Sequence, residues 1–539
     1  MSILNNPIRY AVAAAIAGTA ATSANAISIS NYHANASSNV NVYISGSTAL
    51  DGTLTNAAIQ TAAGQTGLCQ SGSTDIYLIG TSNKLIYCSA TAASGLTVGT
   101  PLAIFKESQV GSANGVQPLI NVAKGGTAGT NFIDPTVIQD STCGTAVTTS
   151  ATGDFGTFVT HAGCASTAVT AGTPTGGFAD VEAAILQTAA GAAISATDAG
   201  TYLTASPTLD QVWAIALTKN MYYALQTAEG LTSTCPASFT VYGSVVSSPT
   251  FTGKDSPSCA PSLSKQQVAS LLTQTVATGT QLGITNATDD TIYLCRRDFG
   301  SGTEASFEAY FVGERCSKTS LSVPGEDGFT VWAAGSGGGV RTCLQAFNAG
   351  GKTLTGFYGT YTIGTVGNQY AVGFINTEIT AANLSGASDG FRLVAIDGVL
   401  PQVANVQNGT YPYFSTGNSY QIRTHSPPYP GTPTGLPLTA FNAITAKIGH
   451  PVWTADSNTN YSANPWGVAG DVSPAGLYAA TNPPTLPASH TTASTNPTNA
   501  FTKTASLSIN NCDQPVFDST HLSAAPVESV LLGTGTVNN

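Results

Sequence analysis

Charged side chains are scarce in this chain of 539 residues. Asp, Glu, Lys and Arg together make up 8% of it, against about 25% in an ordinary soluble domain. Only 17 residues are Lys or Arg and the net charge is −11, so no basic stretch can neutralise the phosphates of a nucleic acid. We therefore expect no nucleic-acid partner. The acidic field also repels small anions, so an anion site has to be local, built from main-chain N–H groups and one or two arginines.

Three further absences narrow the function. After the N-terminal segment no run of 18 apolar residues occurs, so no later membrane span is expected. No Cys-x-x-Cys pair is present, which argues against a zinc site built on cysteines. No Gly-x-Ser-x-Gly elbow follows an expected strand, no carboxylate cluster is seen, and the six histidines are scattered. We therefore expect neither a catalytic residue, nor a metal, nor a cofactor, and no enzyme.

What is abundant indicates a folded, loop-rich protein. Hydrophobic residues make up 42% of the chain, and 57 residues are Gly. This apolar content is enough to fill cores, unlike that of disordered chains. The length suits two or more lobes rather than one compact core.

The N-terminal segment 1–26 has the pattern of a signal peptide. Arg9 provides the positive charge, an Ala-rich apolar run begins at Ala11, and Ala24–Ala26 is a small-x-small cleavage site. Such a segment predicts export. We expect a periplasmic or secreted protein without a membrane span after cleavage.

The ten cysteines fit an exported protein, because an even number in an oxidising compartment favours disulfides. Most of them fall in pairs about twenty residues apart, which predicts local bridges, although spacing alone does not establish connectivity. By elimination, the fifth bridge joins the two cysteines that remain. The expected pairs are Cys69–Cys88, Cys143–Cys164, Cys235–Cys259, Cys295–Cys316 and Cys343–Cys512.

Strand-like and helix-like segments alternate along most of the chain, which predicts an α/β fold with mostly parallel strands. Residues 181–192 have a helical pattern, and Ser262 or Ser264 is suited to cap a helix that runs through Leu272. Residues 425–500 are rich in Pro, Thr, Ser and Asn with little periodicity, so we expect an irregular decoration there. In open α/β sheets, ligands bind where strands lead into helices.

Three turns of Gly and Ser or Thr occupy such places. They are Gly46–Ala49, Gly111–Gly115 and Gly300–Thr303, each after an expected strand. Glycine lets the main chain approach a ligand, and the first N–H groups of the following helix point at the same spot. One such turn by itself is more often a plain helix cap, but three in one chain indicate an anion site.

Two charged residues add chemistry to these turns. Arg297 ends the strand before the third turn, where a guanidinium can bind two oxygens of an anion. Asp180 is placed to accept a hydrogen bond from an oxyanion that still carries a proton, which would favour hydrogenphosphate over sulfate. The alternative for Asp180 is the cap of the expected helix 181–192.

The segment Cys295–Thr303, read CRRDFGSGT, resembles the Arg-x-Asp-Gly-Ser-Gly-Thr signature of the phosphate-binding proteins of bacterial phosphate importers. Further segments resemble other motifs of that family and occur in family order: Ser45–Ala49, Gln109–Val116, Gly177–Asp180, Gly335–Val340, Tyr370–Phe374 and Asn408–Pro412. The match runs from about residue 41 to 413. Two departures are Phe299, where the family has Asp, and Ala49, where it has an aromatic residue.

The resemblance implies a two-lobed fold of the type 2 periplasmic-binding class, with disulfide-stapled insertions. It implies a first lobe from residues 27–205 and 396–539, including the decoration 425–500, and a second lobe from 206–395. The implied partners are inorganic phosphate or a similar oxyanion and an inner-membrane ABC importer. The implied ligand-binding residues are Thr48, Ala49, Ser112, Asp180, Arg297, Ser301, Gly302 and Thr303.

One other function fits the same sequence. Low charge, long insertions and abundant Ser, Thr and Asn also suit a secreted surface or assembly protein that reuses this fold with a decayed or different ligand site. The two functions differ in whether Arg297, Asp180 and the three turns meet at one cavity.

Overall fold

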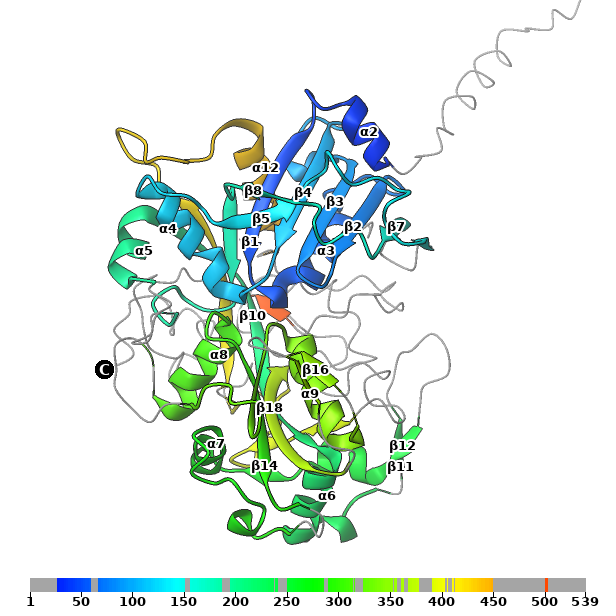
Figure 1. The fold of residues 1–539 in the computed structure, drawn as a ribbon, viewed down its shortest axis with the longest axis vertical. Coiled ribbons are helices and arrows are strands. Elements are labelled where there is room, and N and C mark those ends of the chain that lie inside the picture. Colours follow the sequence, from blue (N-terminus) through cyan, green and yellow to red (C-terminus); the bar gives the residue numbers. More distant parts are fainter. Residues whose placement is uncertain are drawn as a thin grey trace, which may run out of the picture.

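A computed structural model gives the structure of this chain (Figure 1). It describes residues 27–59, 66–150, 156–186, 194–236, 238–240, 250–285, 289–313, 315, 323–351, 353–355, 360–362, 367–377, 390–402, 405, 410–411, 413–448 and 500–502. The expected signal peptide and residues 449–499 of the expected decoration lie outside these ranges. None of the described helices has the length and apolar character needed to cross a bilayer.

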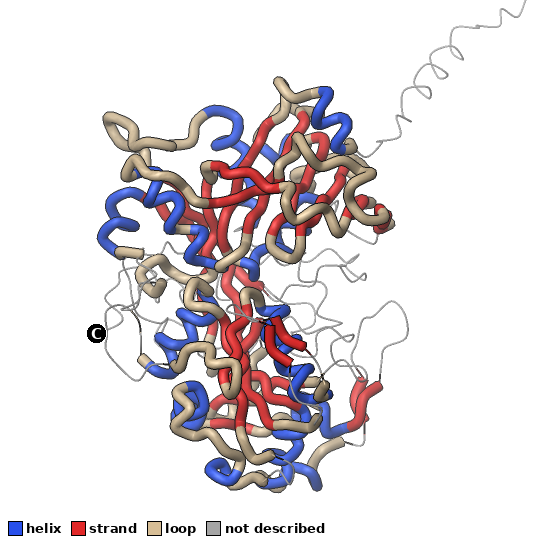
Figure 2. The backbone as a smooth tube through the Cα atoms, in the orientation of Figure 1, coloured by secondary structure: helices blue, strands red, loops and turns tan. Residues whose placement is uncertain are grey.

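The molecule has two lobes, an upper and a lower one in Figure 1, and mixes strands with helices in both. The expected two-lobed α/β architecture is confirmed. The expectation of mostly parallel strands is wrong, because antiparallel pairings outnumber parallel ones in the large sheet of the described residues. A sheet of 14 strands runs through both lobes, and its main path has the order β15-β14-β18-β10-β21-β9-β1-β4-β3-β2-β7-β6. Figure 2 shows this band of strands passing through the waist of the molecule, with helices on its flanks.

The upper lobe contains the N-terminal half of the sheet. Its central strands β1 and β4 are parallel, and β9 pairs with β1 on the other side. Its strands are β1 (Val40–Gly46), β2 (Thr74–Ile79), β3 (Asn83–Ser89), β4 (Pro101–Glu107), β5 (Thr130–Ile133), β6 (Ala146–Thr149), β7 (Phe158–His161), β8 (Val169–Gly172) and β9 (Gly176–Ala179). Its helices and 3-10 turns are α2 (Ile29–Ala34), η1 (Thr48–Leu50), α3 (Asp51–Ile59), η2 (Ala92–Ser94), η3 (Gly111–Gly115), α4 (Gln117–Ala123), α5 (Ala196–Tyr202) and α12 (Gly435–Ile448).

The lower lobe is built on β14, which lies parallel to both β15 and β18. Its main strands are β14 (Ile292–Arg297), β15 (Val331–Ala334), β18 (Tyr370–Asn376) and β19 (Phe391–Leu393). Short pairs are β11 (Ser238–Thr240) with β12 (Thr250–Thr252), β13 (Ser262–Leu263) with β20 (Ala395–Ile396), and β16 (Thr353–Thr355) with β17 (Thr360–Thr362). Helical elements are α6 (Lys219–Ala228), η4 (Leu231–Ser233), η5 (Gly253–Asp255), η6 (Pro257–Cys259), α7 (Lys265–Leu272), η7 (Thr280–Leu282), α8 (Gly302–Phe307), the π-helical turn η8 (Glu308–Val312) and α9 (Gly337–Ala349).

Strands β10 (Leu203–Thr218) and β21 (Phe414–Ile422) join the lobes, and β22 (Ala500–Thr502) pairs with β10. The first residues of β10 pair with β21, and its last residues pair with β18 and β19 of the lower lobe. Leu203 is part of an upper hydrophobic cluster, whereas Trp213 is part of a lower one. Both strands thus pass from one core to the other. The division at residues 27–205, 206–395 and 396–539 stays a proposal.

The second half of β10 shows why the chain is extended there. Trp213, Ile215 and Leu217 face one hydrophobic cluster, whereas Ala214 and Ala216 face another. Side chains alternate between the two faces of a strand, so a continuous apolar run is suited to a strand that is covered on both sides.

Four disulfides are present among the described residues. Cys69–Cys88, Cys143–Cys164 and Cys235–Cys259 are confirmed. The fourth joins Cys295 to Cys343, so the expected pairs Cys295–Cys316 and Cys343–Cys512 are wrong. Helix α9 packs over β14, which brings two cysteines 48 residues apart into contact. Cys316 and Cys512 lie outside the described residues.

Two local expectations have opposite outcomes. Ser264 caps α7 in a capping box with Gln267, and the helix ends at Leu272 as expected. The expected helix 181–192 is absent over its described part, because residues 181–186 form bends and turns. Asp180 is therefore not the cap of a helix that starts at residue 181.

Candidate functional site

A cavity of about 270 Å³ lies where the two lobes meet. Its upper wall includes Thr48, Ala49 and Asp51, and its lower wall includes Arg297 and Thr303. The start of α9 adds Ser336, Gly337, Gly338 and Arg341, and β10 and β18 add Trp213, Phe374, Ile375 and Asn376. Four of the eight residues expected at the ligand thus line one cavity: Thr48, Ala49, Arg297 and Thr303.

The other four expected residues lie in the seam beside this cavity. The Ser112 hydroxyl donates to Asp180 Oδ1, and the Asp180 N–H donates to Ser112 Oγ at 2.9 Å. The Thr303 hydroxyl donates to Asp180 Oδ2 at 3.4 Å. A Cβ on Gly302 would collide with Ser112 Oγ and lie 3.0 Å from Asp180 Cγ. The carboxylate of Asp180 is buried and already satisfied by hydroxyls from both lobes.

The second and third turns also touch through their main chains. The Ala113 N–H donates to the Gly300 carbonyl at 2.8 Å. Gly111 has φ +69°, and a Cβ there would lie 3.2 Å from Ser301 Cα and 3.5 Å from Arg297 Nη2. This backbone conformation and this close approach both favour glycine. The lobes are therefore in direct contact at these turns.

The third turn is organised by Asp298 and Ser301. Asp298 Oδ1 accepts a hydrogen bond from the Gly300 N–H at 3.1 Å, and Ser301 caps α8 by accepting from the Glu304 N–H at 3.4 Å. Burial raises the pKa of Asp298 above its usual value, against the lowering effect of nearby Arg297. Phe299, which departs from the family pattern, is partly exposed and lies 4.8 Å from the guanidinium carbon of Arg296.

Arg297 is buried and held by main-chain carbonyls. Its Nε donates to the Ala334 carbonyl and its Nη2 to the Gly335 carbonyl, both at 3.2 Å. These contacts use two of the five N–H donors of a guanidinium. The side chain therefore reaches the cavity wall in a fixed orientation, set by the end of β15 rather than by a neighbouring carboxylate.

Behind the third turn lies a buried network of two arginines and two glutamates. Arg296 pairs with Glu304 and, at 2.9 Å, with Glu308, which also pairs with Arg315. The Arg297 N–H donates to Glu304 Oε2 at 3.0 Å, which links the network to the cavity wall. Burial raises the pKa of Glu304 to about 8, although the charge of Arg296 opposes the shift. The sequence analysis did not predict this network. In the sequence, Glu304 has the position of an ordinary residue in the first turn of a helix, and Glu308 that of an exposed helix residue.

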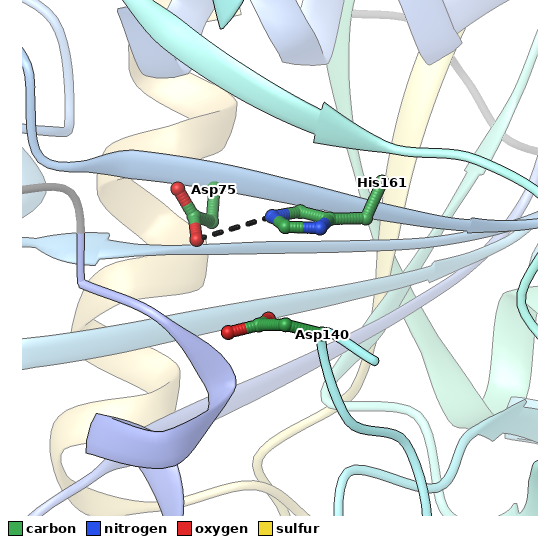
Figure 3. Close-up of side chains that lie close together, drawn as sticks. All are labelled: Asp75, Asp140 and His161. Atoms are coloured by element: carbon green, nitrogen blue, oxygen red, sulfur yellow. Dashed lines mark ion pairs between the residues drawn. The ribbon is translucent and has the colours of Figure 1, made fainter. Parts of the chain in front are cut away.

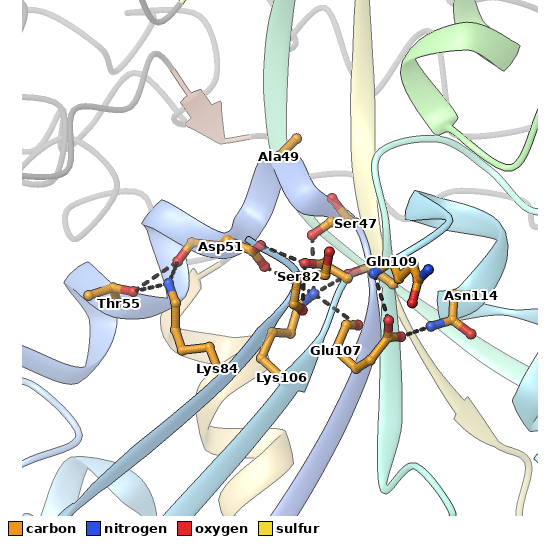
Figure 4. Close-up of polar contacts among 12 residues, drawn as sticks. Ser47, Ala49, Asp51, Thr55, Ser82, Lys84, Lys106, Glu107, Gln109 and Asn114 are labelled. Carbon is orange, nitrogen blue, oxygen red and sulfur yellow. Dashed lines mark hydrogen bonds and ion pairs between the residues drawn. The ribbon is translucent and has the colours of Figure 1, made fainter. Parts of the chain in front are cut away.

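The first turn is supported by two lysines, of which Lys106 is buried and Lys84 is half-buried (Figure 4). Ser47 has φ 23°, a region that side chains avoid. The Lys106 ammonium donates to the Ser47 carbonyl at 3.2 Å and pairs with Asp51 Oδ1 at 3.0 Å. The Lys84 ammonium donates to the Asp51 carbonyl at 3.1 Å and to Thr55 Oγ1 at 2.7 Å. Burial lowers the pKa of Lys84.

The N-terminus of α9 is the part of the cavity that the expected site did not include. Ser336 caps this helix of 13 residues by accepting from the Gly339 N–H at 3.1 Å. The Arg341 Nη2 donates to Asn376 Oδ1 at 3.1 Å. In the segment Gly335–Val340 a Ser is followed by three Gly. This pattern could have predicted a fourth anion-binding turn from the sequence.

No family model matches the chain, and no curated protein matches it. Solved structures do match. A putative phosphate ABC transporter substrate-binding protein with bound phosphate from Clostridium perfringens is 13% identical, with a TM-score of 0.35, covering 75% of this chain and 92% of its own. An ancestral soluble variant of the human phosphate binding protein is 13% identical, with a TM-score of 0.30, covering 56% and 77%. An ABC-type phosphate transport receptor from Vibrio cholerae is 13% identical, with a TM-score of 0.25, covering 50% and 74%. Likeness at this level does not assign a ligand.

Proposed function

We propose that this protein is an exported, non-enzymatic solute-binding protein that holds a phosphate-like oxyanion between its two lobes. The observation that carries the proposal is the shared cavity of Arg297, Arg341 and the N-terminus of α9. Two guanidinium groups and the positive end of a helix dipole are brought to one space in a chain with a net charge of −11.

The local charge of the cavity favours an anion. Asp51 is the carboxylate in the lining, and its charge is opposed by the buried ammonium of Lys106. Arg297 is held by uncharged carbonyls, so its positive charge is not cancelled by those contacts. Main-chain N–H groups of Thr48, Ala49 and the start of α9 complete a set of donors suited to oxygen atoms.

Asp180 has a distinct role in this proposal. Thr303 lies in the cavity wall and its hydroxyl donates to Asp180. Rotation of that hydroxyl, together with a small opening of the seam, brings the carboxylate to the ligand. A carboxylate there accepts a hydrogen bond from hydrogenphosphate and repels sulfate, which has no proton to donate near neutral pH.

Ligand entry requires the lobes to separate, because Ala113, Gly300 and Gly302 are packed across the seam. Strands β10 and β21 join the lobes and are the elements about which such a motion would turn. The periplasm or the extracellular space is the compartment, and an inner-membrane ABC importer is the partner that this function implies.

A second candidate function is favoured by one observation. Ser112, Asp180 and Thr303 satisfy one another and Gly302 closes over them, as expected for a binding site that has become a packed interface. In that case the protein is a secreted surface or assembly protein that keeps the fold and has lost the ligand.

Calorimetric titration with phosphate, arsenate and sulfate distinguishes the two functions. The proposal expects saturable binding of phosphate and arsenate by the wild type. Arg297→Met should weaken it by roughly 2–5 kcal/mol. Arg423→Met is the matched control, because Arg423 is exposed and donates to the Leu203 carbonyl away from the cavity. A wild-type protein that binds none of the three anions would establish the second function instead.

A further inference from the structure

A second cluster of ionisable side chains lies in the upper lobe, apart from the residues that line the interlobe cavity. It consists of Asp75 on β2, Asp140 in the turn before β6, and His161 at the end of β7 (Figure 3). One ligand atom from each of the three residues lies within 4.8 Å of the other two. Asp75 and His161 are buried, whereas Asp140 is exposed.

Two buried side chains of this cluster carry atoms without a hydrogen-bond partner. Asp75 is 3% exposed and His161 is 5% exposed. Within the described part of the chain, Asp75 Oδ1 and both ring nitrogens of His161 make no well-formed hydrogen bond. His161 Nε2 lies 3.4 Å from Asp75 Oδ2. Buried polar atoms are normally satisfied, so the unsatisfied ring nitrogens of His161, beside a buried carboxylate, indicate a missing partner.

The charge of the cluster indicates that this partner is a cation. The Tyr77 hydroxyl lies between the two carboxylates, at 3.2 Å from Asp75 Oδ2 and 2.6 Å from Asp140 Oδ1. Among the described residues neither carboxylate forms an ion pair with Lys or Arg. Two carboxylates therefore face one imidazole, an excess of negative charge that a divalent cation would neutralise.

The surrounding frame holds the three residues in place. His161 lies opposite Tyr77 in the parallel pair of β2 and β7, and the two rings stack at 4.5 Å with an angle of 8° between their planes. The disulfide Cys143–Cys164 follows Asp140 and His161 by three residues each. This bridge keeps the turn of Asp140 beside the strand of His161, so the ligands are positioned before a metal arrives.

We propose that Asp75, Asp140 and His161 form a binding site for a divalent first-row transition metal, of which Zn²⁺ is the natural test. One imidazole and two carboxylates are a donor set that Zn²⁺ accepts, with bonds of about 2.0–2.2 Å. Atoms bound in a tetrahedron at that length lie about 3.3 Å apart, close to the 3.4 Å between His161 and Asp75. Asp140, on an exposed turn, supplies the third ligand, and a water molecule takes the fourth position. The site ties the turn of Asp140 to the sheet.

The experiment is a titration of the full-length exported protein with Zn²⁺, after treatment with a chelator, by calorimetry and by the shift in Tm. We expect one saturable equivalent and a higher Tm with Zn²⁺ present, because a ligand of the native state stabilises it. Asp140→Asn should weaken Zn²⁺ binding at least tenfold while leaving the Tm of the metal-free protein nearly unchanged, since the side chain is exposed and the amide oxygen can still accept from the Tyr77 hydroxyl. His161→Gln should weaken it about a hundredfold.

Asp134→Asn is the matched control, because this carboxylate lies on the same excursion and hydrogen-bonds locally to Thr136. It should bind Zn²⁺ like the wild type. Absence of saturable Zn²⁺ binding, or equal affinity in the wild type and Asp140→Asn, would overturn the proposal. The cluster would then be a structural Tyr-His-Asp contact. Neither result depends on whether the interlobe cavity binds an anion.

Discussion

The upper and lower walls of the interlobe cavity are both supported by buried charges, but the two sets differ in composition. The lower wall rests on Arg296, Glu304, Glu308 and Arg315, all almost fully buried. The upper wall rests on Lys84 and Lys106 around Asp51, whose side chain is 20% exposed. Arginine forms planar, two-oxygen contacts, whereas a lysine ammonium acts as a point charge that also binds carbonyls.

This difference teaches how each wall presents its donors. In the lower wall, Glu304 accepts a hydrogen bond from the main-chain N–H of Arg297. The network therefore fixes the end of the strand without engaging the Arg297 guanidinium, which lies at the cavity wall. In the upper wall, Lys106 holds the carbonyl of Ser47 in its unusual conformation, so the turn of Thr48 and Ala49 that lines the cavity is held in place. The lower wall presents a side-chain charge, whereas the upper wall presents a supported main-chain turn.

Arg296→Met is the substitution in the lower wall for which we expect the largest loss of stability. The change leaves Glu304 and Glu308 buried with only Arg315 as a cation, and we expect a loss of about 3–5 kcal/mol in unfolding free energy. Urea unfolding followed by circular dichroism measures it. Arg423→Met, on the surface, should change stability by less than about 0.5 kcal/mol. Equal stabilities of the two variants would show that the network is not coupled to the fold.

The corresponding change in the upper wall is Lys106→Met. We expect a smaller loss, on the order of 1–3 kcal/mol, because Asp51 is partly exposed and keeps its hydrogen bond from Ser108 at 2.8 Å. The same unfolding experiment gives the comparison. If Lys106→Met costs more than Arg296→Met, the upper wall is the more tightly coupled of the two.

The pH dependence of the unfolding free energy tests the upper wall through Glu107, which lies at the end of β4 next to Lys106. Burial raises the pKa of Glu107 to about 7 from its ordinary value of 4.5. The native Glu107 therefore keeps a proton that the unfolded chain has lost, so its contribution to the unfolding free energy should fall by about 2–3 kcal/mol between pH 4.5 and pH 7. Below pH 4.5 this contribution is fully present. In Glu107→Gln this part of the fall should be absent, and identical pH profiles for variant and wild type would contradict the shift.

The smallest expected effect concerns the seam between the walls. Asp180→Asn keeps the size of the side chain but adds a donor where Ser112 and Thr303 now donate. Phosphate affinity should fall modestly, and discrimination against sulfate should weaken, because the excluding charge is gone. Paired calorimetric titrations with both anions test this. Unchanged selectivity would remove Asp180 from the specificity of the site.

The residues expected at the ligand fall into two groups, those that line the cavity and those that are buried beside it. The turns at residues 46–49 and 300–303 are strand ends followed by helical elements, and the structure places them so. Thr48, Ala49, Arg297 and Thr303 reach the cavity. The other four expected residues pack against one another beside the cavity: Ser112, Asp180, Ser301 and Gly302. Whether such a residue lines the cavity or is buried next to it depends on how closely the two lobes approach, which a local sequence pattern does not encode.

The disulfides show the same limit. Three bridges join cysteines 19, 21 and 24 residues apart, a range in which sequence spacing is informative. The bridge from Cys295 to Cys343 depends on α9 packing over β14, and local spacing carries no information about that packing. The wrong assignment of Cys316 arose from applying a local rule to a contact between a strand and a helix.

The sequence by itself determined the α/β class, the two-lobed architecture, three of the disulfides and the location of Arg297 at the end of a strand. The two-lobed architecture came from the chain length and from the resemblance to phosphate-binding proteins. The other features follow from periodicity, turn residues and short-range spacing, which act within a few tens of residues. Only the tertiary structure decided that Arg341 and the start of α9 share the cavity of Arg297, that Asp180 is enclosed by hydroxyls, and that Asp75, Asp140 and His161 meet. Each of these juxtapositions joins segments distant in the chain, and their distances depend on how whole elements pack, which no local pattern encodes.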